Sequence, residues 1–456
     1  MTNLVWLRRN LRLDDNLPLF KALQSPDKVQ LVFILDSDIL SRFPNPLDKR
    51  LAFIKIALQS IDCQLQKYGG KLLVCRGRPQ ELIPIIAKSI GAKKIFADED
   101  YEPANIQRDA DVAKALDGIA ELQLYCDHLI FHPKDILKSD VSPFKIYTPY
   151  MKAFRNKLSH SRFLKYNSLE LLQGRVLSFP QDLLSQNDAV NTEQLLESVI
   201  IPGYDISKAH DICDDFILNK MKSYQDKRDA MSCNGTSKLS AYLRFGVISI
   251  RELFRKAYDK DNSFTWINEL IWREFYTSIL YHFPYSANSE FNSKYANIPW
   301  GNDEGLLSAI TNARTGYPII DAAINELIAT GWMHNRARMI VASFWTKNLF
   351  LDWRLGEEFF AQHLMDYELA SNVGGWQWSA SCGTDAQPYF RVFNPMLQSQ
   401  KFDALGEYIK RYIPFLRNVP VKDIHNIDAL KSYNYIPPIV DYVSSRNRAI
   451  YIFKNI

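Results

Sequence analysis

The first 130 residues alternate between short apolar runs rich in β-branched residues and longer segments whose apolar positions recur with a helical period. Continuous apolar strands separated by helices are typical of a parallel sheet that is buried on both faces. The pattern therefore predicts a doubly wound, Rossmann-like α/β domain over residues 1–130. Its predicted strands are 3–7, 29–36, 71–77, 93–100 and 121–126, and its predicted helices are 16–24, 49–69, 79–91 and 105–117.

The periodic pattern breaks down after residue 130. Residues 131–200 hold one short helical segment, 151–158, and polar stretches such as 185–194, which indicate a long interdomain connector. From residue 201 onward strand patterns fade and helical periods dominate, so we predict a large all-helical domain over residues 201–456. Its clearest predicted helices are 249–259, 265–280, 318–330 and 334–349.

Composition narrows the class of protein only slightly. A net charge of +4 over 456 residues permits a nucleic-acid partner without requiring one. The six cysteines form no C-x-x-C pair and the eight histidines lack metal-ligand spacing, so we expect reduced thiols and no metal site. No apolar run approaches the roughly 20 residues that span a bilayer, and the chain starts without a signal-peptide pattern. These features favour a cytoplasmic protein that does not enter a membrane.

The usual dinucleotide fingerprint, G-x-G-x-x-G after the first strand, is missing. A different candidate for phosphate binding is the segment NGTSKLSAYLRFG, in which Thr236, Ser237 and Ser240 lie at the start of a predicted helix. Their hydroxyls and the free backbone N–H groups there suit a phosphate. The alternative is an ordinary helix cap, which is the commoner use of such residues.

Polar and aromatic side chains occupy one face of the predicted helix 265–280. Glu269, Trp272, Arg273 and Tyr276 lie at positions i, i+3, i+4 and i+7. A buried carboxylate or guanidinium needs a partner or a ligand, so this face indicates either a polar binding site or a surface helix with ion pairs.

The predicted helix 334–349 repeats this theme. Asn335 and Met339 are one turn apart, and an amide beside a thioether suits a flat ligand with polar edges, although a helical Met more often fills a core. Asn has a poor helix propensity, so an Asn in the middle of a helix suggests a functional or structural role. Arg338 lies on the neighbouring face, where Asp366 is a candidate partner.

The short stretch GGWQW, residues 374–378, belongs to a region that holds eight of the nine tryptophans, from Trp266 to Trp378. Paired glycines allow a tight turn or a close approach to a ligand. Trp376 and Trp378 are two positions apart and cannot share one face of a helix, so we expect them to contact different neighbours.

Several longer motifs resemble one known family. The segments NELIWREFY, TGYPIIDAAINELIATGWMHNRARM, DWRLGEEFF and ASNVGGWQWSASCGTDAQPYFRVFNPMLQSQKFD are similar to the flavin-binding domain of the photolyase/cryptochrome family, and VWLRRNLRLDDN resembles its first strand and turn. The resemblance covers nearly the whole chain. It implies an N-terminal antenna-pigment domain, and a helical domain at 201–456 that binds a U-shaped FAD and a DNA lesion. The most similar members are class I photolyases, which act on cyclobutane pyrimidine dimers.

The resemblance also implies residue roles around FAD. Asn372 is at the position that faces flavin N5, and the pair of Arg338 with Asp366 lies by the isoalloxazine, where a cation favours the anionic reduced form, FADH⁻. Glu368 stands where many relatives have Asp. The full implied set of FAD contacts is Tyr224, Thr236, Ser237, Lys238, Leu239, Ser240, Trp266, Glu269, Arg273, Asn335, Arg338, Asp366, Glu368 and Asn372.

A second implied set touches DNA. The lesion pocket is expected to hold Glu269, Trp272, Asn335, Met339 and Trp378. Photolyases for the (6-4) lesion carry histidines at the positions of residues 335 and 339, which this chain lacks. His334 is adjacent, but on a helix its side chain is expected to point about 100 degrees away. The implied backbone and flanking contacts are Arg228, Arg336, Gln400 and Lys401.

Taken together, the resemblance implies light-driven repair of pyrimidine dimers by a monomeric carbon–carbon lyase, in which Glu269, Asn335, Met339 and Asn372 act directly in catalysis. The lesion flips out of the duplex and receives an electron from excited FADH⁻. Trp376, Trp353 and Trp300 match the family's chain of tryptophans that reduces oxidised flavin in light. The alternatives are a cryptochrome-type light sensor that signals by protein interaction, and an ordinary flavin oxidoreductase.

The antenna pigment follows less directly from the motifs. Ala104 and Asn105 do not reproduce the Asn-Glu pair of folate-binding members, while FILDSDIL and EDYEP are more similar to members that bind a deazaflavin. We therefore expect 8-hydroxy-deazaflavin first and methenyltetrahydrofolate second, with an empty or flavin-filled site as further alternatives.

Overall fold

The computed structural model describes residues 2–42, 48–178 and 204–456. They form two compact units, each assembled from separate stretches of the chain. The first unit contains Met1–Leu137, Ala153–Ile217 and Ser237–Ser263, and the second contains Lys138–Lys152, Leu218–Thr236 and Phe264–Ile456. Residues 179–200 of the predicted connector, including the polar stretch 185–194, lie outside the described residues.

A five-stranded parallel sheet is the centre of the first unit, with the strand order β3-β2-β1-β4-β5. Val5, Leu31 and Val32 on its central strands are fully buried, as expected for strands covered on both faces. The predicted strands and the predicted fold class are confirmed. The strands are β1 (Thr2–Leu7), β2 (Lys28–Asp36), β3 (Leu73–Gly77), β4 (Ala92–Asp98) and β5 (Glu121–Tyr125).

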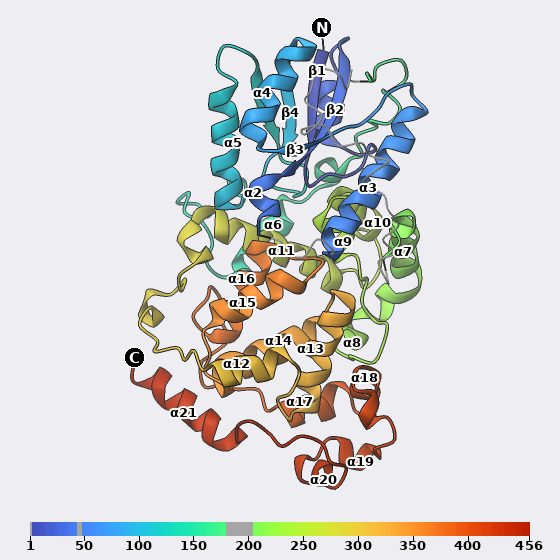
Figure 1. Cartoon of the computed structure of the whole chain (residues 1–456). Coiled ribbons are helices and arrows are strands. Elements are labelled where there is room, and N and C mark those ends of the chain that lie inside the picture. The colour runs from blue at the N-terminus through green and yellow to red at the C-terminus, as the bar shows by residue number, and fades with distance from the viewer. Residues whose placement is uncertain (1, 43–47, 179–203) are drawn as a thin grey trace. The chain divides into compact units, whose positions relative to one another are not determined.

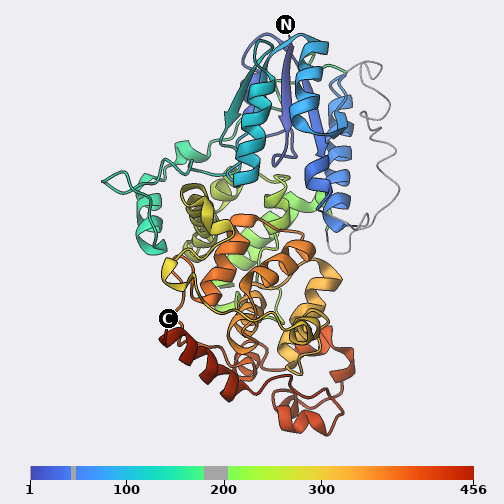
Figure 2. The same ribbon diagram turned by 60° about the vertical axis from the view of Figure 1, so that its left-hand side comes forward.

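The helices of the first unit cover both faces of this sheet. In Figure 1, α4 and α5 lie on one side of the strands and α3 lies on the other. After a turn of 60°, helices of this unit project over the strands (Figure 2). The predicted helices of residues 1–130 and 249–259 are confirmed. The helices are α1 (Leu17–Ala22), α2 (Ser37–Leu40), α3 (Lys49–Gln66), α4 (Pro79–Ile90), α5 (Pro103–Ala115), α7 (Ala209–Asp215), α9 (Ser240–Arg244) and α10 (Ile250–Ala257).

The second unit is built from helices around a large apolar core. The helices α11, α13 and α14 confirm predicted elements, although the predicted helix 334–349 changes to a π-helix at Phe344–Asn348. Both views show α18 to α21, coloured red, at the margin of this unit (Figures 1 and 2). Its helices are α8 (Tyr224–Lys227), α11 (Phe264–His282), α12 (Glu304–Thr311), α13 (Pro318–Thr330), α14 (Asn335–Ser343), α15 (Trp353–His363), α16 (Leu369–Ala380), α17 (Pro395–Phe402), α18 (Glu407–Tyr412), α19 (Val421–Ile424), α20 (Ile427–Lys431) and α21 (Tyr442–Lys454).

One further helix, α6 (Tyr147–Lys157), contains the predicted helix 151–158, apart from its last residue. Local signals explain many of the helix ends. Pro79 and Pro318 occupy the first helical position of α4 and α13, where proline costs no hydrogen bond. Gly91 and Gly331 end the same helices in the left-handed conformation. None of the described helices has the length and apolar character of a transmembrane span.

Buried charges anchor α10 inside the first unit. The guanidinium of Arg251 donates to a carboxylate oxygen of Asp15 at 3.0 Å and to one of Asp127 at 2.7 Å, and Arg12 also pairs with Asp127. Burial favours the neutral form of Asp127, but the two arginines outweigh it and hold its pKa below the ordinary value. The network joins the turn after β1, the segment after β5 and α10.

Replacing Arg251 with Met should lower the free energy of unfolding by about 3–5 kcal/mol, because two buried carboxylates lose a shared partner. Urea unfolding followed by circular dichroism measures the effect. The control is Lys431→Met, which breaks the exposed pair with Asp428 and should change stability by less than about 0.5 kcal/mol. Equal unfolding midpoints for the two variants would show that the network does not stabilise the unit.

Candidate active site in the second unit

Helix α16 is the central element of the site, because it packs against α11, α14 and α15. A Cβ added at Gly374 would lie 2.2 Å from the ring of Tyr276 on α11, and one added at Gly356 of α15 would lie 2.2 Å from the ring of Trp376. The absence of a side chain at these two positions therefore lets the rings lie directly against helix backbone.

The paired glycines do not form a tight turn, as one expectation had it, because both lie inside helix α16. The other expectation, a close approach to a ligand, stays a prediction; at Gly374 the backbone closely approaches the Tyr276 ring instead. Gly375 differs from Gly374, since, apart from its chain neighbours and the nearby backbone of its own helix, no described atom comes within 4 Å of the position of an added Cβ. Open space therefore adjoins α16 at Gly375.

Two ion pairs fix the residues that precede α16. Arg338 on α14 donates to both carboxylate oxygens of Asp366, at 3.0 and 2.8 Å, so the predicted pair is present. Arg273 on α11 donates to Glu368 at 3.0 Å, and both side chains are buried. Breaking one partner of such a buried pair is costly, so the two pairs hold the start of α16 against α11 and α14.

The side chain of Asn372 points toward α15. Its amide nitrogen donates to the Glu357 carboxylate at 2.9 Å and to the Glu357 backbone oxygen at 3.1 Å. The Tyr367 hydroxyl donates to the same carboxylate at 3.0 Å. Glu357 thus fixes the orientation of the Asn372 amide, a role that the sequence pattern did not identify.

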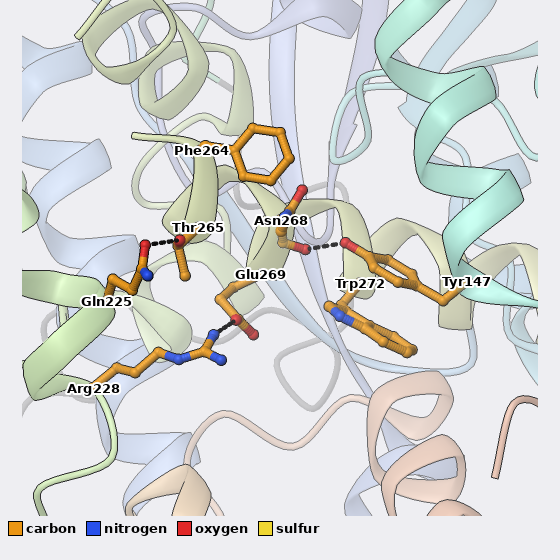
Figure 3. Close-up of a pocket in the computed structure, with 8 residues that line it drawn as sticks. All are labelled: Tyr147, Gln225, Arg228, Phe264, Thr265, Asn268, Glu269 and Trp272. Carbon is orange, nitrogen blue, oxygen red and sulfur yellow. Dashed lines mark hydrogen bonds and ion pairs between the residues drawn. The ribbon is translucent and has the colours of Figure 1, made fainter. Parts of the chain in front are cut away.

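A pocket of about 420 Å³ opens beside α11. Figure 3 shows that Glu269 and Trp272 face it from α11, while Arg228 reaches it from the segment after α8. Arg228 donates to the Glu269 carboxylate at 2.6 Å, and both side chains are about one-third exposed. Burial nevertheless raises the pKa of Glu269, against the opposing effect of Arg228. The other lining residues are Tyr147, Gln225, Phe264, Thr265 and Asn268.

Tyr147 is an unexpected part of this pocket, because it comes from the predicted connector. Its ring stacks on the Trp272 indole with centroids 3.6 Å apart and planes within 7°. Its hydroxyl donates to the backbone oxygen of Asn268 at 2.9 Å, as Figure 3 shows. One face of Trp272 is therefore covered. Trp378, the second expected wall, is half-buried on α16 and does not line this pocket.

The start of α14 corrects two expectations. Asn335 is the first residue of the helix and not a mid-helix residue, so its presence there carries little helix-propensity cost. His334 is the N-cap, and its ring accepts a hydrogen bond from the backbone of Arg336 at 3.1 Å, so the angle expected on a helix does not apply. The exposed amide of Asn335 donates to the Met339 sulfur at 3.8 Å, which confirms that the two side chains are neighbours.

The expected DNA contacts differ in their surroundings. Arg336 donates to Asp229 at 2.8 Å, and its guanidinium lies 4.2 Å from the Phe402 ring centroid, so its side chain is only 16% exposed. Gln400 and Lys401 are exposed on α17. Gln400 and Lys401 are thus more exposed than Arg336, and Arg228 is about one-third exposed.

The expected phosphate segment divides between the units. Tyr224 and Thr236 belong to the second unit, while Ser237, Lys238, Leu239 and Ser240 belong to the first. Helix α9 begins at Ser240 and has five residues, and no side chain caps its start. Lys238 adopts a positive φ of 54°. Trp266, another expected FAD contact, is buried in the first turn of α11.

The tryptophans named from the sequence occupy distinct environments. Trp376 and Trp353 are buried, whereas Trp300 is partly exposed. The indole N–H groups of Trp353 and Trp300 both donate to Glu290, each at 3.2 Å. Trp345, which the sequence did not single out, lies edge-on to Trp376 with ring centroids 5.6 Å apart. Trp376 is buried and Trp378 is half-buried, and the expectation that the two indoles contact different neighbours stays a prediction.

Comparisons with known proteins identify the family. The model described as DNA photolyase matches residues 3–166, and the model described as the FAD binding domain of DNA photolyase matches residues 266–455. A deoxyribodipyrimidine photo-lyase of Synechococcus sp. is 39% identical over 460 residues, which cover 96% of this chain and 93% of that protein. The chain belongs to the photolyase/cryptochrome family. FAD is its cofactor, as the sequence resemblance implied.

Solved structures of photolyases share this fold over the whole chain. A bacterial class III photolyase from Agrobacterium tumefaciens has a TM-score of 0.88 and 30% identity, covering 100% of this chain and 97% of its own. An archaeal photolyase from Sulfolobus tokodaii, whose structure has two FAD molecules, has a TM-score of 0.85 and 31% identity and covers 100% of both chains. Because a class III enzyme matches this well, assignment to class I stays a prediction.

The contact between α16 and α11 gives a direct test. Gly374→Ala should destabilise the apoprotein by about 1–3 kcal/mol, because the new methyl group meets the Tyr276 ring. Gly375→Ala is the matched control in the same helix and should stabilise it by about 0.5–1 kcal/mol, since the position is open and Ala is the better helix former. Thermal unfolding of the two variants measures the difference. Equal destabilisation by both would contradict this packing.

Proposed function

We propose that the protein repairs cyclobutane pyrimidine dimers in DNA by light-driven electron transfer from reduced FAD. The observation that carries the proposal is the pocket at α11, where the carboxylate of Glu269 and the indole of Trp272 face one hollow in a member of this family. A flat apolar wall beside a hydrogen-bonding group suits a pyrimidine pair swung out of the duplex.

The second unit offers a suitable environment for FAD. Open space adjoins α16 at Gly375, and the buried Nε1 of Trp376 has no hydrogen-bond partner among the described residues. We propose that Arg338 with Asp366, Arg273 with Glu368, and Asn372 surround the flavin ring. When bound, the reduced cofactor supplies on excitation the electron that splits the dimer. The guanidiniums of Arg338 and Arg273 favour its anionic form by their charge.

Phosphate and ribityl contacts from Tyr224, Thr236, Ser237, Lys238, Leu239 and Ser240, and ring contacts from Trp266, Glu269 and Asn335, complete the proposed FAD site. Lys238 in this segment has a positive φ, a backbone conformation that is uncommon for residues other than glycine.

Glu269 has two protonation states with different uses in lesion binding. A carboxylate accepts hydrogen bonds from pyrimidine N–H groups, whereas a protonated Glu269 donates to a pyrimidine carbonyl oxygen. Burial raises its pKa and so favours the donor form, while Arg228 favours the acceptor form. We propose that the lesion displaces Arg228, which then contacts a DNA phosphate. Asn335 and Met339 on α14 and Trp378 on α16 complete the proposed lesion contacts.

The proposed DNA surface contains Arg228, Arg336, Gln400 and Lys401. Phosphate contacts of this kind bind without regard to sequence and weaken as salt rises, so the lesion supplies the specificity. Arg336 contacts DNA only if its hydrogen bond to Asp229 breaks. A monomeric state and a cytoplasmic location stay predictions from the sequence.

Replacing Trp272 with Ala should weaken binding of a dimer-containing oligonucleotide roughly 5- to 150-fold, because one stacking surface is lost. Fluorescence anisotropy in darkness measures binding, and blue light followed by chromatography measures repair. Tyr451→Ala removes a 71% exposed ring on α21 and is the control that should change neither quantity. Absence of repair by the wild-type holoenzyme would favour the cryptochrome alternative.

We further propose 8-hydroxy-deazaflavin as the antenna pigment, with methenyltetrahydrofolate as the second candidate. The Asn105 amide in the first turn of α5 donates to Asp100 at 3.0 Å and is therefore engaged with the segment before the helix, which argues against a folate contact there. Absorption and mass spectra of pigment released from the purified protein should show the deazaflavin. A folate spectrum, or a second equivalent of flavin, would overturn this assignment.

A further inference from the structure

Glu290 joins two of the tryptophans of the second unit. Its carboxylate is 4% exposed, and its Oε1 accepts hydrogen bonds from the indoles of Trp300 and Trp353, both at 3.2 Å. Its Oε2 accepts from Arg354 at 2.7 Å. One buried carboxylate therefore contacts both indoles through a single oxygen and a cation through the other.

The loop that carries Glu290 is fixed by Gln377, the residue between the two tryptophans of GGWQW. The Gln377 side chain donates to the backbone oxygens of Ser286 and Ser289 at 2.9 and 2.8 Å and accepts from the Phe291 backbone N–H at 2.9 Å. These three bonds connect the loop to α16. The position of the carboxylate is thus built into the fold.

Arg354 makes the surroundings of the two indoles unequal. Its guanidinium carbon lies 4.7 Å from the centre of the Trp353 ring, while among the described residues no cation lies over Trp300. Trp300 instead packs against the rings of Phe350 and Phe453. The guanidinium of Arg354 therefore repels a positive charge on the Trp353 indole, whereas a positive charge on the Trp300 indole has no such close cation beside it in the described part of the chain.

We propose that Glu290 and Arg354 set the direction of electron transfer between these two indoles. The shared carboxylate stabilises the positive charge that remains on an indole after it has lost an electron. The guanidinium repels that charge from Trp353 and so favours its transfer to Trp300. Both are positioning residues. The inference rests on the proposed function, because it concerns photoreduction of the same flavin.

The electron balance of this step is simple. One electron moves from Trp353 toward the photoexcited oxidised cofactor, and Trp300 then returns one electron to Trp353. Oxidised Trp300 is partly exposed and is reduced by a small-molecule thiol, whereas buried Trp353 is out of reach of the solvent. The hydrogen bond from Arg354 is among the causes that hold the pKa of Glu290 below its ordinary value despite burial, so the carboxylate stays charged at neutral pH.

The test uses flash excitation of the oxidised holoenzyme and transient absorption of tryptophan radicals. Glu290→Gln, which removes the charge but keeps an acceptor, should lower the yield of long-lived radical by about tenfold or more, as expected for loss of a close, buried charge. Arg354→Gln should preserve the total yield but lower the fraction that an added thiol reduces, because the charge stays on buried Trp353. Exposed Glu304→Gln is the control and should behave like the wild type.

A second readout does not depend on the cofactor. In the apoprotein labelled with ¹⁵N-tryptophan, Glu290→Gln should shift two indole N–H signals together, because Trp300 and Trp353 share one acceptor. Unchanged radical yield in a variant that shows this double shift would overturn the inference, as would equal loss in both Arg354→Gln and Glu290→Gln. Repair by chemically reduced wild-type enzyme tests the proposed function separately, since that assay does not use the tryptophan chain.

Discussion

The close packing of α16 against α11 and α15 is the constraint on which the site depends. Two missing side chains make it possible, because Gly374 admits the Tyr276 ring and Gly356 admits the Trp376 ring. The ion pairs of Arg273 with Glu368 and Arg338 with Asp366 then fix where the helix begins. The guanidiniums of Arg273 and Arg338 and the amide of Asn372 are therefore each bonded to a neighbouring segment of the second unit.

The sheet could be predicted closely from the sequence, because a strand buried on both faces must be apolar throughout, and the run from Val29 to Leu35 shows this pattern. Helix 265–280 was likewise clear from its period. The pairing of Arg338 with Asp366 could also be predicted, because a guanidinium on a partly apolar helix needs an acidic partner and Asp366 offered one. The strands and helix 265–280 could be predicted because each depends on the pattern of residues within its own segment.

The missed features all depend on contacts between distant segments. Tyr147 stacks on Trp272 from 125 positions away, and no periodicity in the connector marks it. No sequence motif marks Glu357 or Glu290, because their acceptor roles arise only when Asn372 or the indoles are brought to them. The error at His334 came from placing the start of α14 one residue too early, which turns a cap into a helical residue. Asn335 was treated as a mid-helix residue although it lies at the very start of the helix.

The five residues of GGWQW show how one turn and a half of helix can serve several tasks at once. Gly374 sets the distance to α11, Gly375 leaves open space, Trp376 fills the core beside Trp345, and Gln377 holds the loop of Glu290. Successive residues of a helix point in directions about 100° apart, so each of these contacts needs its own position. The same geometry that separates Trp376 from Trp378 also places Gln377 between them, so α16 carries both the support of the Glu290 loop and one of the proposed lesion contacts, while the other proposed wall, Trp272, lies on α11.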